Sequence, residues 1–472
     1  MKFALRSVAV LTILLVLAIS TYLIMARPVV TGYAAKHMCS GLWVGGLPGQ
    51  WLKEQAIAPA LQPASPWLNY IIDHNRHRVS VSFLWYEQTA SWRGYQPLPP
   101  EQEQQTRINL GCVLLNEYGT DGLPIGDWQQ GRFSGTDITA KTVEKPTNMA
   151  KTATDKLKDI NKDRLDQLLT QAFQETGEAP RNTLAVLVSH RGRLIAEQYA
   201  GPVQPNTPML GWSMSKSLLP TWIAIQEQIE QREINPKVAD NWPWLSAQMT
   251  LKQLLRMESG LEFSEWYQPG DDVTTMLYQQ GNMPSWVASQ TAGATGPRWA
   301  YSSGDSNLAS FEWTQQLGSD WRSWLVSNVW LPLSITSATV ETDRTDTPVT
   351  SSYVHMSPRD WLKIGQLWLD GWHNRSPLLP ENWMQQATQP SNIHTWGLYG
   401  EGFWLNLGSE QRGSKWPSLP KSVFWARGHD GQYVLVAPEQ ELVVVRFGLT
   451  PGSNDGLDTL VAGLIDTLDQ TH

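Results

Sequence analysis

Cysteine is scarce in this chain, since only two of its 472 residues, Cys39 and Cys112, are cysteines. The sequence contains no Cys-x-x-Cys and no His-x-x-x-His pair, so it offers no recognisable zinc site, and we expect neither a metal nor an organic cofactor. Charged residues make up 17% of the chain and the formal net charge is -8. Because Lys and Arg are scattered and form no basic stripe, nucleic acid is excluded as an expected partner.

One long apolar run stands at the N-terminus. Residues 7–26, SVAVLTILLVLAISTYLIMA, are uncharged and numerous enough to cross a bilayer as a helix. Lys2 and Arg6 precede this run, which favours a cytoplasmic N-terminus. No clear small-x-small cleavage site follows it. We therefore predict a transmembrane signal anchor over residues 1–32 in a bacterial inner membrane, with the rest of the chain in the periplasm. A cleaved signal and a soluble periplasmic form are the alternative.

Export makes the two cysteines informative. An oxidising compartment favours a disulfide between Cys39 and Cys112. Closing a loop of that size would stabilise the fold by ~4 kcal/mol in the chain-entropy model. Two buried free thiols are the alternative.

The exported part divides by composition into three segments. Residues 33–125 are rich in Gly, Trp and alternating apolar residues, which predicts a small β-rich lead-in segment with strands at 77–88 and 109–119. Residues 126–158 are polar with little apolar periodicity and are typical of a linker. The main domain is expected to occupy residues 159–472.

The order of elements in the main domain predicts an α+β fold. A helix begins near residue 160, and a hairpin with its turn at Arg191-Gly192 follows. After a mostly helical middle, strands return over residues 422–448, and a helix covers 456–468. An antiparallel sheet built from both ends of the domain, with helices on its faces and a helical insertion, satisfies this order.

The stretch GWSMSKSLLP places Ser213 three residues before Lys216, where an apolar helical run begins. Roughly two chance Ser-x-x-Lys matches are expected in a chain this long. A second match, Ser418 to Lys421, contains Pro420 and precedes no helical run, so we assign it to a loop. Only the first match therefore stands in a setting that suits catalysis.

A helix start offers Ser213 unpaired amides and a positive dipole, which suit a developing oxyanion. Lys216 lies one turn later on the same helix face, and it can accept the serine proton if burial lowers its pKa. A simple helix N-cap is the alternative role for Ser213.

Two later stretches complete a candidate site. In YSSGDSN, Tyr301 stands at the head of a helix, where a phenol can relay a proton if positive neighbours depress its pKa. In RGHDGQY, His429 and Gly431 stand at a strand start, where glycine lets backbone amides approach a substrate closely.

Three spaced motifs form one set: Ser213-x-x-Lys216, Tyr301-x-Ser303 and His429-x-Gly431. This set resembles the serine-reactive family of class C β-lactamases, DD-peptidases and related esterases. GWSMSKS, SGLEFSEWYQPGDDV, YSSGDSN, MSPRDWLKIGQLWL and GHDGQYVLVAPEQELVVVR resemble its 6-aminohexanoate-dimer hydrolase branch in the same order. The resemblance covers about residues 160–470 and implies a β-lactamase/transpeptidase-like fold.

The resemblance also implies roles for individual residues. Ser213 would be the acylated nucleophile, Lys216 its activator, and Tyr301 the group that passes a proton to the leaving group. The backbone amides of Ser213 and Gln432 would form the oxyanion hole, and Tyr267 would reach a leaving amine. The implied substrate is a small ester or amide.

Two departures from the family pattern bear on the alternatives. Penicillin-recognising members have Asn at the position of Ser303, and many have Lys at the position of His429. Both differences argue against a peptidoglycan DD-peptidase or penicillin-binding enzyme. A catalytically inactive envelope binding protein on the same fold is a further alternative. Retention of Ser213, Lys216 and Tyr301 together argues against it.

Overall fold

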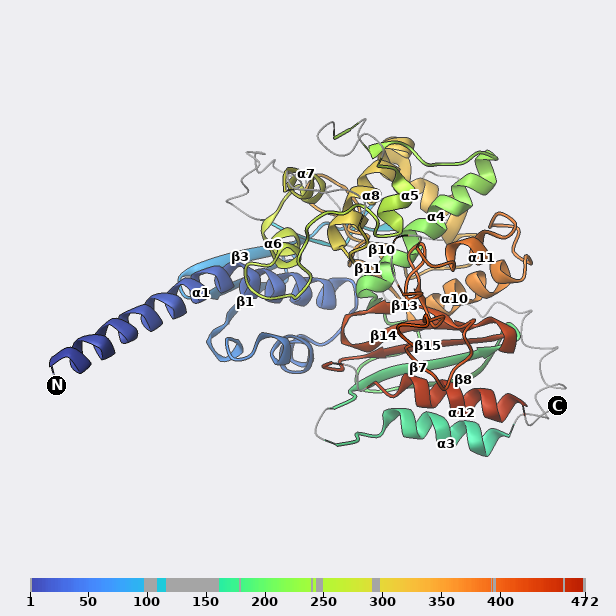
Figure 1. Cartoon of the computed structure of the whole chain (residues 1–472), viewed down its shortest axis with the longest axis horizontal. Coiled ribbons are helices and arrows are strands. Elements are labelled where there is room, and N and C mark those ends of the chain that lie inside the picture. Colours follow the sequence, from blue (N-terminus) through green and yellow to red (C-terminus); the bar gives the residue numbers. More distant parts are fainter. Residues whose placement is uncertain are drawn as a thin grey trace.

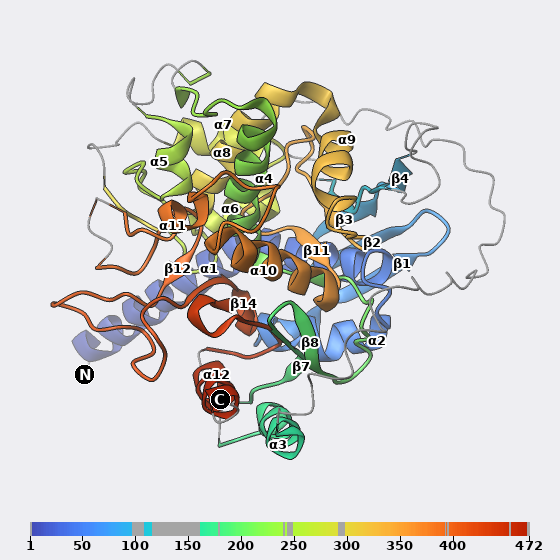
Figure 2. The same ribbon diagram turned by 90° about the vertical axis from the view of Figure 1, so that its right-hand side faces the viewer.

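The computed structural model describes the following residues: 2–96, 108–115, 161–177, 180–238, 241–242, 249–290, 298–391, 393, 396–452 and 455–469. A six-stranded antiparallel sheet forms the centre of the main domain, with strand order β12-β13-β14-β15-β7-β8 (Figures 1 and 2). Its strands are β7 Thr183–His190, β8 Arg193–Tyr199, β12 Trp404–Leu405, β13 Phe424–Gly428, β14 Gln432–Ala437 and β15 Leu442–Gly448. Since β15 from the end of the chain pairs with β7 from the start of the domain, the predicted α+β arrangement is confirmed.

The central strands are apolar throughout because helices cover both faces of the sheet. β14 and β15 are buried along their whole length, as is β7 up to its last residue. Helix α10, Pro358–Trp372, packs on β7, β14 and β15. Helices α3, Lys162–Phe173, and α12, Leu457–Asp469, cover the opposite face (Figure 1). The helices predicted near residue 160 and at 456–468 are therefore present.

The predicted helical insertion lies between β8 and β12. Its helices are α4 Ser215–Glu230, α5 Leu251–Leu255, α6 Asp272–Gln279, α7 Met283–Ser289, α8 Ser303–Leu317, α9 Trp321–Leu325, α10 and α11 Trp383–Ala387. A small sheet with order β10-β11-β9 joins it to the nucleophile region. The strands of this sheet are β9 Met209–Leu210, β10 Thr339–Val340 and β11 Val354–Met356.

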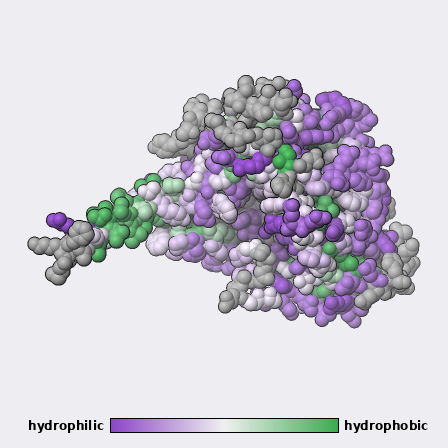
Figure 3. Space-filling model, viewed as in Figure 1, coloured by the Kyte–Doolittle hydropathy of each residue, from purple (hydrophilic) through white to green (hydrophobic). Residues whose placement is uncertain are grey.

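Helix α1 runs without a break from Lys2 to Trp43, past the expected end of the anchor at residue 32. Its residues 6–25 are exposed and form an apolar rod that projects from the body (Figures 1 and 3). From Ala26 onward the helix packs into the same hydrophobic core as the insertion helices. One apolar N-terminal helix of this kind is compatible with a signal anchor or a signal peptide. The division into segments at residues 32, 125 and 158 stays a prediction.

The second half of α1 lies on a sheet with order β1-β2-β3-β6. Its strands are β1 Asn69–Asp73, β2 Arg78–Phe83, β3 Tyr86–Trp92 and β6 Cys112–Leu114; short α2 Gly49–Trp51 and the pair β4 Tyr95–Gln96 and β5 Ile108–Asn109 complete this part. The single strand expected at 77–88 is wrong, because Leu84 and Trp85 turn the chain into a hairpin with φ of 46° and 63°. The linker predicted at 126–158 lies outside the described residues.

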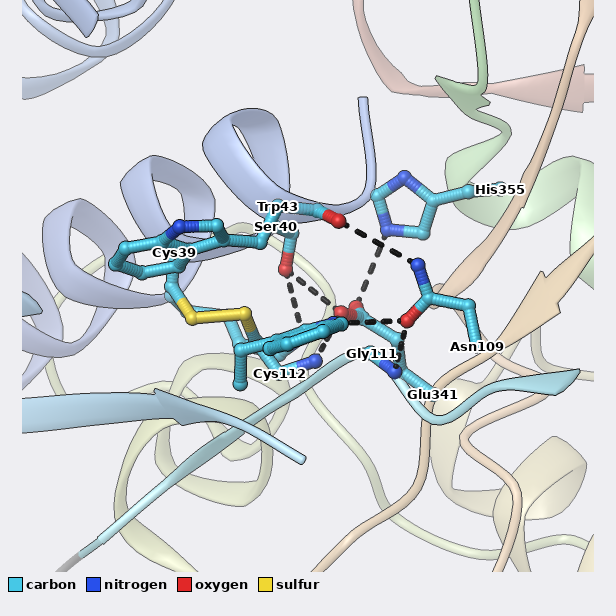
Figure 4. Close-up of a disulfide and its surroundings, with 10 residues drawn as sticks. Cys39, Ser40, Trp43, Asn109, Gly111, Cys112, Glu341 and His355 are labelled. Atoms are coloured by element: carbon cyan, nitrogen blue, oxygen red, sulfur yellow. Dashed lines mark hydrogen bonds and ion pairs between the residues drawn. A yellow bond between two sulfur atoms is a disulfide. The ribbon is translucent and has the colours of Figure 1, made fainter. Parts of the chain in front are cut away.

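A disulfide joins α1 to β6, and a buried ion cluster beside it joins both elements to the main domain (Figure 4). Cys39 and Cys112 form the predicted disulfide, with their Cα atoms 6.1 Å apart. Fully buried Glu341 accepts hydrogen bonds from Ser40 Oγ and the Cys112 amide, each at 2.7 Å. Lys36 forms an ion pair with the same carboxylate, and His355 Nε2 lies 3.2 Å from it.

Burial raises the pKa of Glu341, but the neighbouring Lys36 and His355 outweigh burial and hold this pKa below its usual range. The carboxylate is therefore ionised in the core and attaches the N-terminal helix to the insertion.

Candidate active site

Ser213 lies in a 3-10 turn, Trp212–Met214, that leads directly into α4. Its side chain is partly accessible, whereas Trp212, Met214 and Lys216 are buried. Lys216 Nζ lies 3.1 Å from Ser213 Oγ. The i, i+3 spacing thus places the Lys216 amine within hydrogen-bond distance of the partly accessible Ser213 hydroxyl.

The turn is conformationally strained at Trp212, whose φ is +50°. A bulky non-glycine residue in this region is an outlier, and such strain persists where the surroundings over-determine it. The ring packs against His37 at 4.8 Å and His429 at 5.4 Å between centroids. Residues from two distant segments, α1 and the turn between β13 and β14, therefore hold the backbone that presents Ser213.

Burial lowers the pKa of Lys216 to about 8, and the charge of Glu265 acts in the opposite direction. In addition to Ser213, the ammonium donates to Ser303 Oγ at 3.0 Å and to the Ser351 carbonyl at 2.9 Å. Both acceptors keep the amine in place whether or not it carries its third proton. A lysine with this pKa is substantially neutral slightly above physiological pH and can serve as a base.

Tyr301 immediately precedes α8, whose N-cap Ser302 accepts a hydrogen bond from the Asp305 amide at 3.0 Å. Its ring centroid lies 4.9 Å from Lys216 Nζ, and its hydroxyl interacts with the Ser213 side chain. Burial and the charge of Glu265 raise the pKa of Tyr301 above its ordinary value. The depressed phenol pKa considered from the sequence is therefore not found, and the phenol keeps its proton at neutral pH.

Glu265 is a site residue that the sequence analysis did not identify. Its carboxylate accepts a hydrogen bond from the Ser303 amide, at the start of α8. Burial raises the pKa of Glu265, and the nearby Lys216 charge opposes that rise. Its only signal in the sequence was its place two residues before Tyr267.

Tyr267 and His429 form a stacked pair, with ring centroids 5.3 Å apart and an interplanar angle of 21°. His429 is 45% exposed and its ring also contacts Trp212. The structure thus brings the third motif and the Glu265 loop, which we define as residues 262–271, to the turn Trp212–Met214, which we call the nucleophile turn after the role expected of Ser213. Tyr267 has a φ of +60°, so this loop is strained next to the site.

The turn between β13 and β14 lies directly beside the nucleophile turn. A Cβ atom on Gly428 would collide with the Gly211 carbonyl oxygen, so glycine is required at this contact. Gly431, in the same turn, has a φ of +77°. The Gln432 side chain donates to the Gly448 carbonyl at 2.6 Å and accepts from the Gly448 amide at 3.1 Å. Because its side chain is hydrogen-bonded to β15, Gln432 can offer a substrate its backbone amide.

Helix α1 also contributes to the surroundings of the site. Tyr33 and His37 lie against Trp212, with Tyr33 6.3 Å from it between ring centroids. A cavity of about 90 Å³ is lined by these three residues together with Asp430 and Gln432. The sequence carried no signal for this contact, because α1 and the nucleophile turn are far apart along the chain.

The second Ser-x-x-Lys match and the possible metal ligands remain to be placed. Ser418 is exposed and lies in a loop, so the second Ser-x-x-Lys match is no catalytic pair. Within the described ranges, no three His, Cys, Asp or Glu side chains gather in a way that could hold a metal ion.

The chain was compared with known proteins. The Beta-lactamase family profile matches residues 166–461. A candidate 6-aminohexanoate-dimer hydrolase from Bacillus anthracis has a similar structure, with a TM-score of 0.50, 20% identity and coverage of 65% of this chain and 81% of the other. A candidate beta-lactamase from Bacteroides dorei DSM 17855 gives a TM-score of 0.50 at 16% identity, over 66% of this chain and all of the other. No curated protein matches the sequence.

At these identities the structural likenesses establish the fold alone. The family profile covers more than half of the chain and spans all three motifs. The chain therefore belongs to the Beta-lactamase family.

Proposed function

We propose that this protein is a serine hydrolase that cleaves an ester or amide through an acyl-enzyme on Ser213. The observation that carries the proposal is the 3.1 Å contact between Ser213 Oγ and a buried lysine amine whose pKa burial lowers to about 8. We further propose that α1 anchors the enzyme in a bacterial inner membrane, with the catalytic domain in the periplasm. The exposed apolar length of α1 supports this placement.

Acylation begins when neutral Lys216 takes the proton from Ser213 Oγ, which attacks the substrate carbonyl. The negative charge that develops on the carbonyl oxygen is stabilised by the backbone amides of Ser213 and Gln432. Tyr301 is protonated at neutral pH, and it donates this proton to the leaving alcohol or amine. The Lys216 ammonium then returns a proton to the phenolate. The carbonyl–heteroatom bond breaks and the acyl group stays on Ser213.

Deacylation reverses these roles with water as the nucleophile. Lys216, neutral again, accepts a proton from the water as its oxygen attacks the acyl carbonyl. The carboxylic acid leaves and Ser213 recovers its proton, so that one water is consumed for each bond cleaved. Glu265 takes no part in bond making. Its charge opposes the effect of burial on the pKa of Lys216, and its carboxylate accepts the hydrogen bond of the Ser303 amide.

The test is intact-mass spectrometry of the protein after exposure to a fluorophosphonate. We expect one adduct on the wild-type protein, no adduct on Ser213→Ala, and a retained adduct on the control Ser418→Ala, whose exposed serine belongs to the loop match. A folded protein that forms no adduct would refute the proposal. Labelled penicillin, applied in parallel, is expected not to bind, and stable binding would favour a penicillin-binding enzyme instead.

A further inference from the structure

The end of the membrane-crossing part of α1 lies beside the active site. As a helix, residues 7–26 span about 30 Å, the thickness of a bilayer's hydrocarbon core. Met25 and Arg27 then stand at its exported edge. The end of the Met25 side chain lies directly against Gly270, since a Cβ atom built on that glycine would collide with Met25 Cε. Gly270 belongs to the Glu265 loop, so this loop touches α1 where the helix enters the bilayer.

The same loop exposes a large aromatic side chain. Trp266 is 81% exposed, although its neighbours Glu265 and Tyr267 both contact site residues. Trp266 and Gly270 are four positions apart in the chain, so their backbones lie at most ~14 Å apart. Trp266 is therefore held near the membrane edge of the molecule by its own loop.

A second exposed tryptophan, from the lead-in sheet, lies near the same part of α1. Trp85, at the tip of the β2–β3 hairpin, is 98% exposed. Arg27 Nη1 donates to the Leu84 carbonyl at 3.4 Å, and its guanidinium lies 5.8 Å from the centre of the Tyr86 ring. The tip of the hairpin is thus fixed to the residue at which α1 leaves the bilayer.

The hairpin tip has two energetically unfavourable features, one in its backbone and one in its side chain. Leu84 and Trp85 both have positive φ, in a turn position that normally takes Asn or Gly. The strained backbone also presents a whole indole to solvent. The exposed indole is explained if the ring lies in a membrane interface, where tryptophan is enriched because it is apolar with one polar edge.

We propose that Trp85 and Trp266 dock on the exported-side interface of the membrane that α1 spans, and that the enzyme takes an amphiphilic ester or amide from that bilayer. The proposal rests on the proposed anchor and hydrolase function. Because Trp266 stands between Glu265 and Tyr267, a ring held in the headgroup region places the mouth of the site at the bilayer surface. A substrate with an acyl chain then reaches Ser213 without crossing water.

The experiment uses the full-length protein in phosphatidylcholine/phosphatidylglycerol vesicles. Collisional quenching of tryptophan emission by brominated phosphatidylcholine reports ring contact with the bilayer. The variants are Trp266→Ser and Trp85→Asn, since Asn tolerates the positive φ at residue 85. The control is Trp396→Ser, which removes a ring that is 42% exposed and follows α11, a helix that lies away from the N-terminal end of α1 (Figure 1).

A second readout is the rate of Ser213 modification by two fluorophosphonates. One carries a long alkyl chain that partitions into the vesicles, and the other carries a short polar chain. We expect each test variant to lose part of the quenched emission and to react about fivefold more slowly with the long-chain probe, the factor for ~1 kcal/mol of lost interfacial binding. The rate with the short-chain probe should stay unchanged in every variant, and it also reports correct folding. In Trp396→Ser the quenched emission and the ratio of the two probe rates should both stay unchanged.

The outcomes separate the two proposals. Unchanged quenching in Trp266→Ser would overturn membrane docking, and reduced quenching with an unchanged long-chain rate would overturn delivery of substrate from the bilayer. Failure of both probes to modify Ser213 in wild-type protein would refute the hydrolase proposal instead, whereas the quenching result would still decide the docking.

Discussion

The pKa of Lys216 sets a pH dependence for acylation that can be calculated from the structure. Burial lowers this pKa to about 8. Since only the neutral amine can accept the Ser213 proton, acylation is lost as pH falls through this value. About one tenth of the amine is neutral at pH 7 and about nine tenths at pH 9, which predicts a rise of roughly tenfold followed by a plateau. A solvent-exposed lysine would instead give a rise of roughly a hundredfold with no plateau below pH 10.

The assay is the pseudo-first-order rate of fluorophosphonate adduct formation from pH 6 to 10, followed by intact mass. Ser213→Ala supplies the background at each pH. Tyr301 does not titrate in this range, because burial and Glu265 raise its pKa, so a single midpoint is expected. A rate that still climbs tenfold per unit above pH 9.5, or one that is flat from pH 6 to 8, would show that Lys216 is not the base.

Two further substitutions test the electrostatics of the structure. Glu265→Gln removes the negative charge that raises the Lys216 pKa, so the midpoint of the same profile should move to lower pH; a shift to higher pH would contradict the assignment. Glu341→Gln leaves Lys36 without its anionic partner in the core and should lower the free energy of unfolding by ~3–5 kcal/mol, measured by urea unfolding. The control Glu87→Gln replaces an exposed carboxylate and should change the free energy of unfolding by less than ~0.5 kcal/mol. An equally small effect of Glu341→Gln would refute the role of the ion pair.

Local features of the sequence predicted local structure well. The contact between Ser213 and Lys216 follows from their spacing within one helical turn, and the β7–β8 hairpin follows from its Arg191-Gly192 turn. The strands predicted over residues 422–448 are present as β13, β14 and β15. The turn at Leu84-Trp85 was missed because neither residue is a turn former, and the run Phe83-Leu84-Trp85-Tyr86 contains no Gly, Pro, Asn or Asp.

The amino-acid sequence by itself thus determined the periodic elements, the contact between Ser213 and Lys216, and the apolar N-terminal run. Only the tertiary structure brought Glu265 to the Ser303 amide, placed α1 against Trp212, and joined Lys36 to Glu341 across 305 positions of the chain. The physical reason is that helix and strand periods arise from neighbouring residues, whereas a buried charge finds its partner only when distant segments pack together. For the same reason, the tertiary structure alone revealed that the Glu265 loop contacts Met25 in the apolar part of α1.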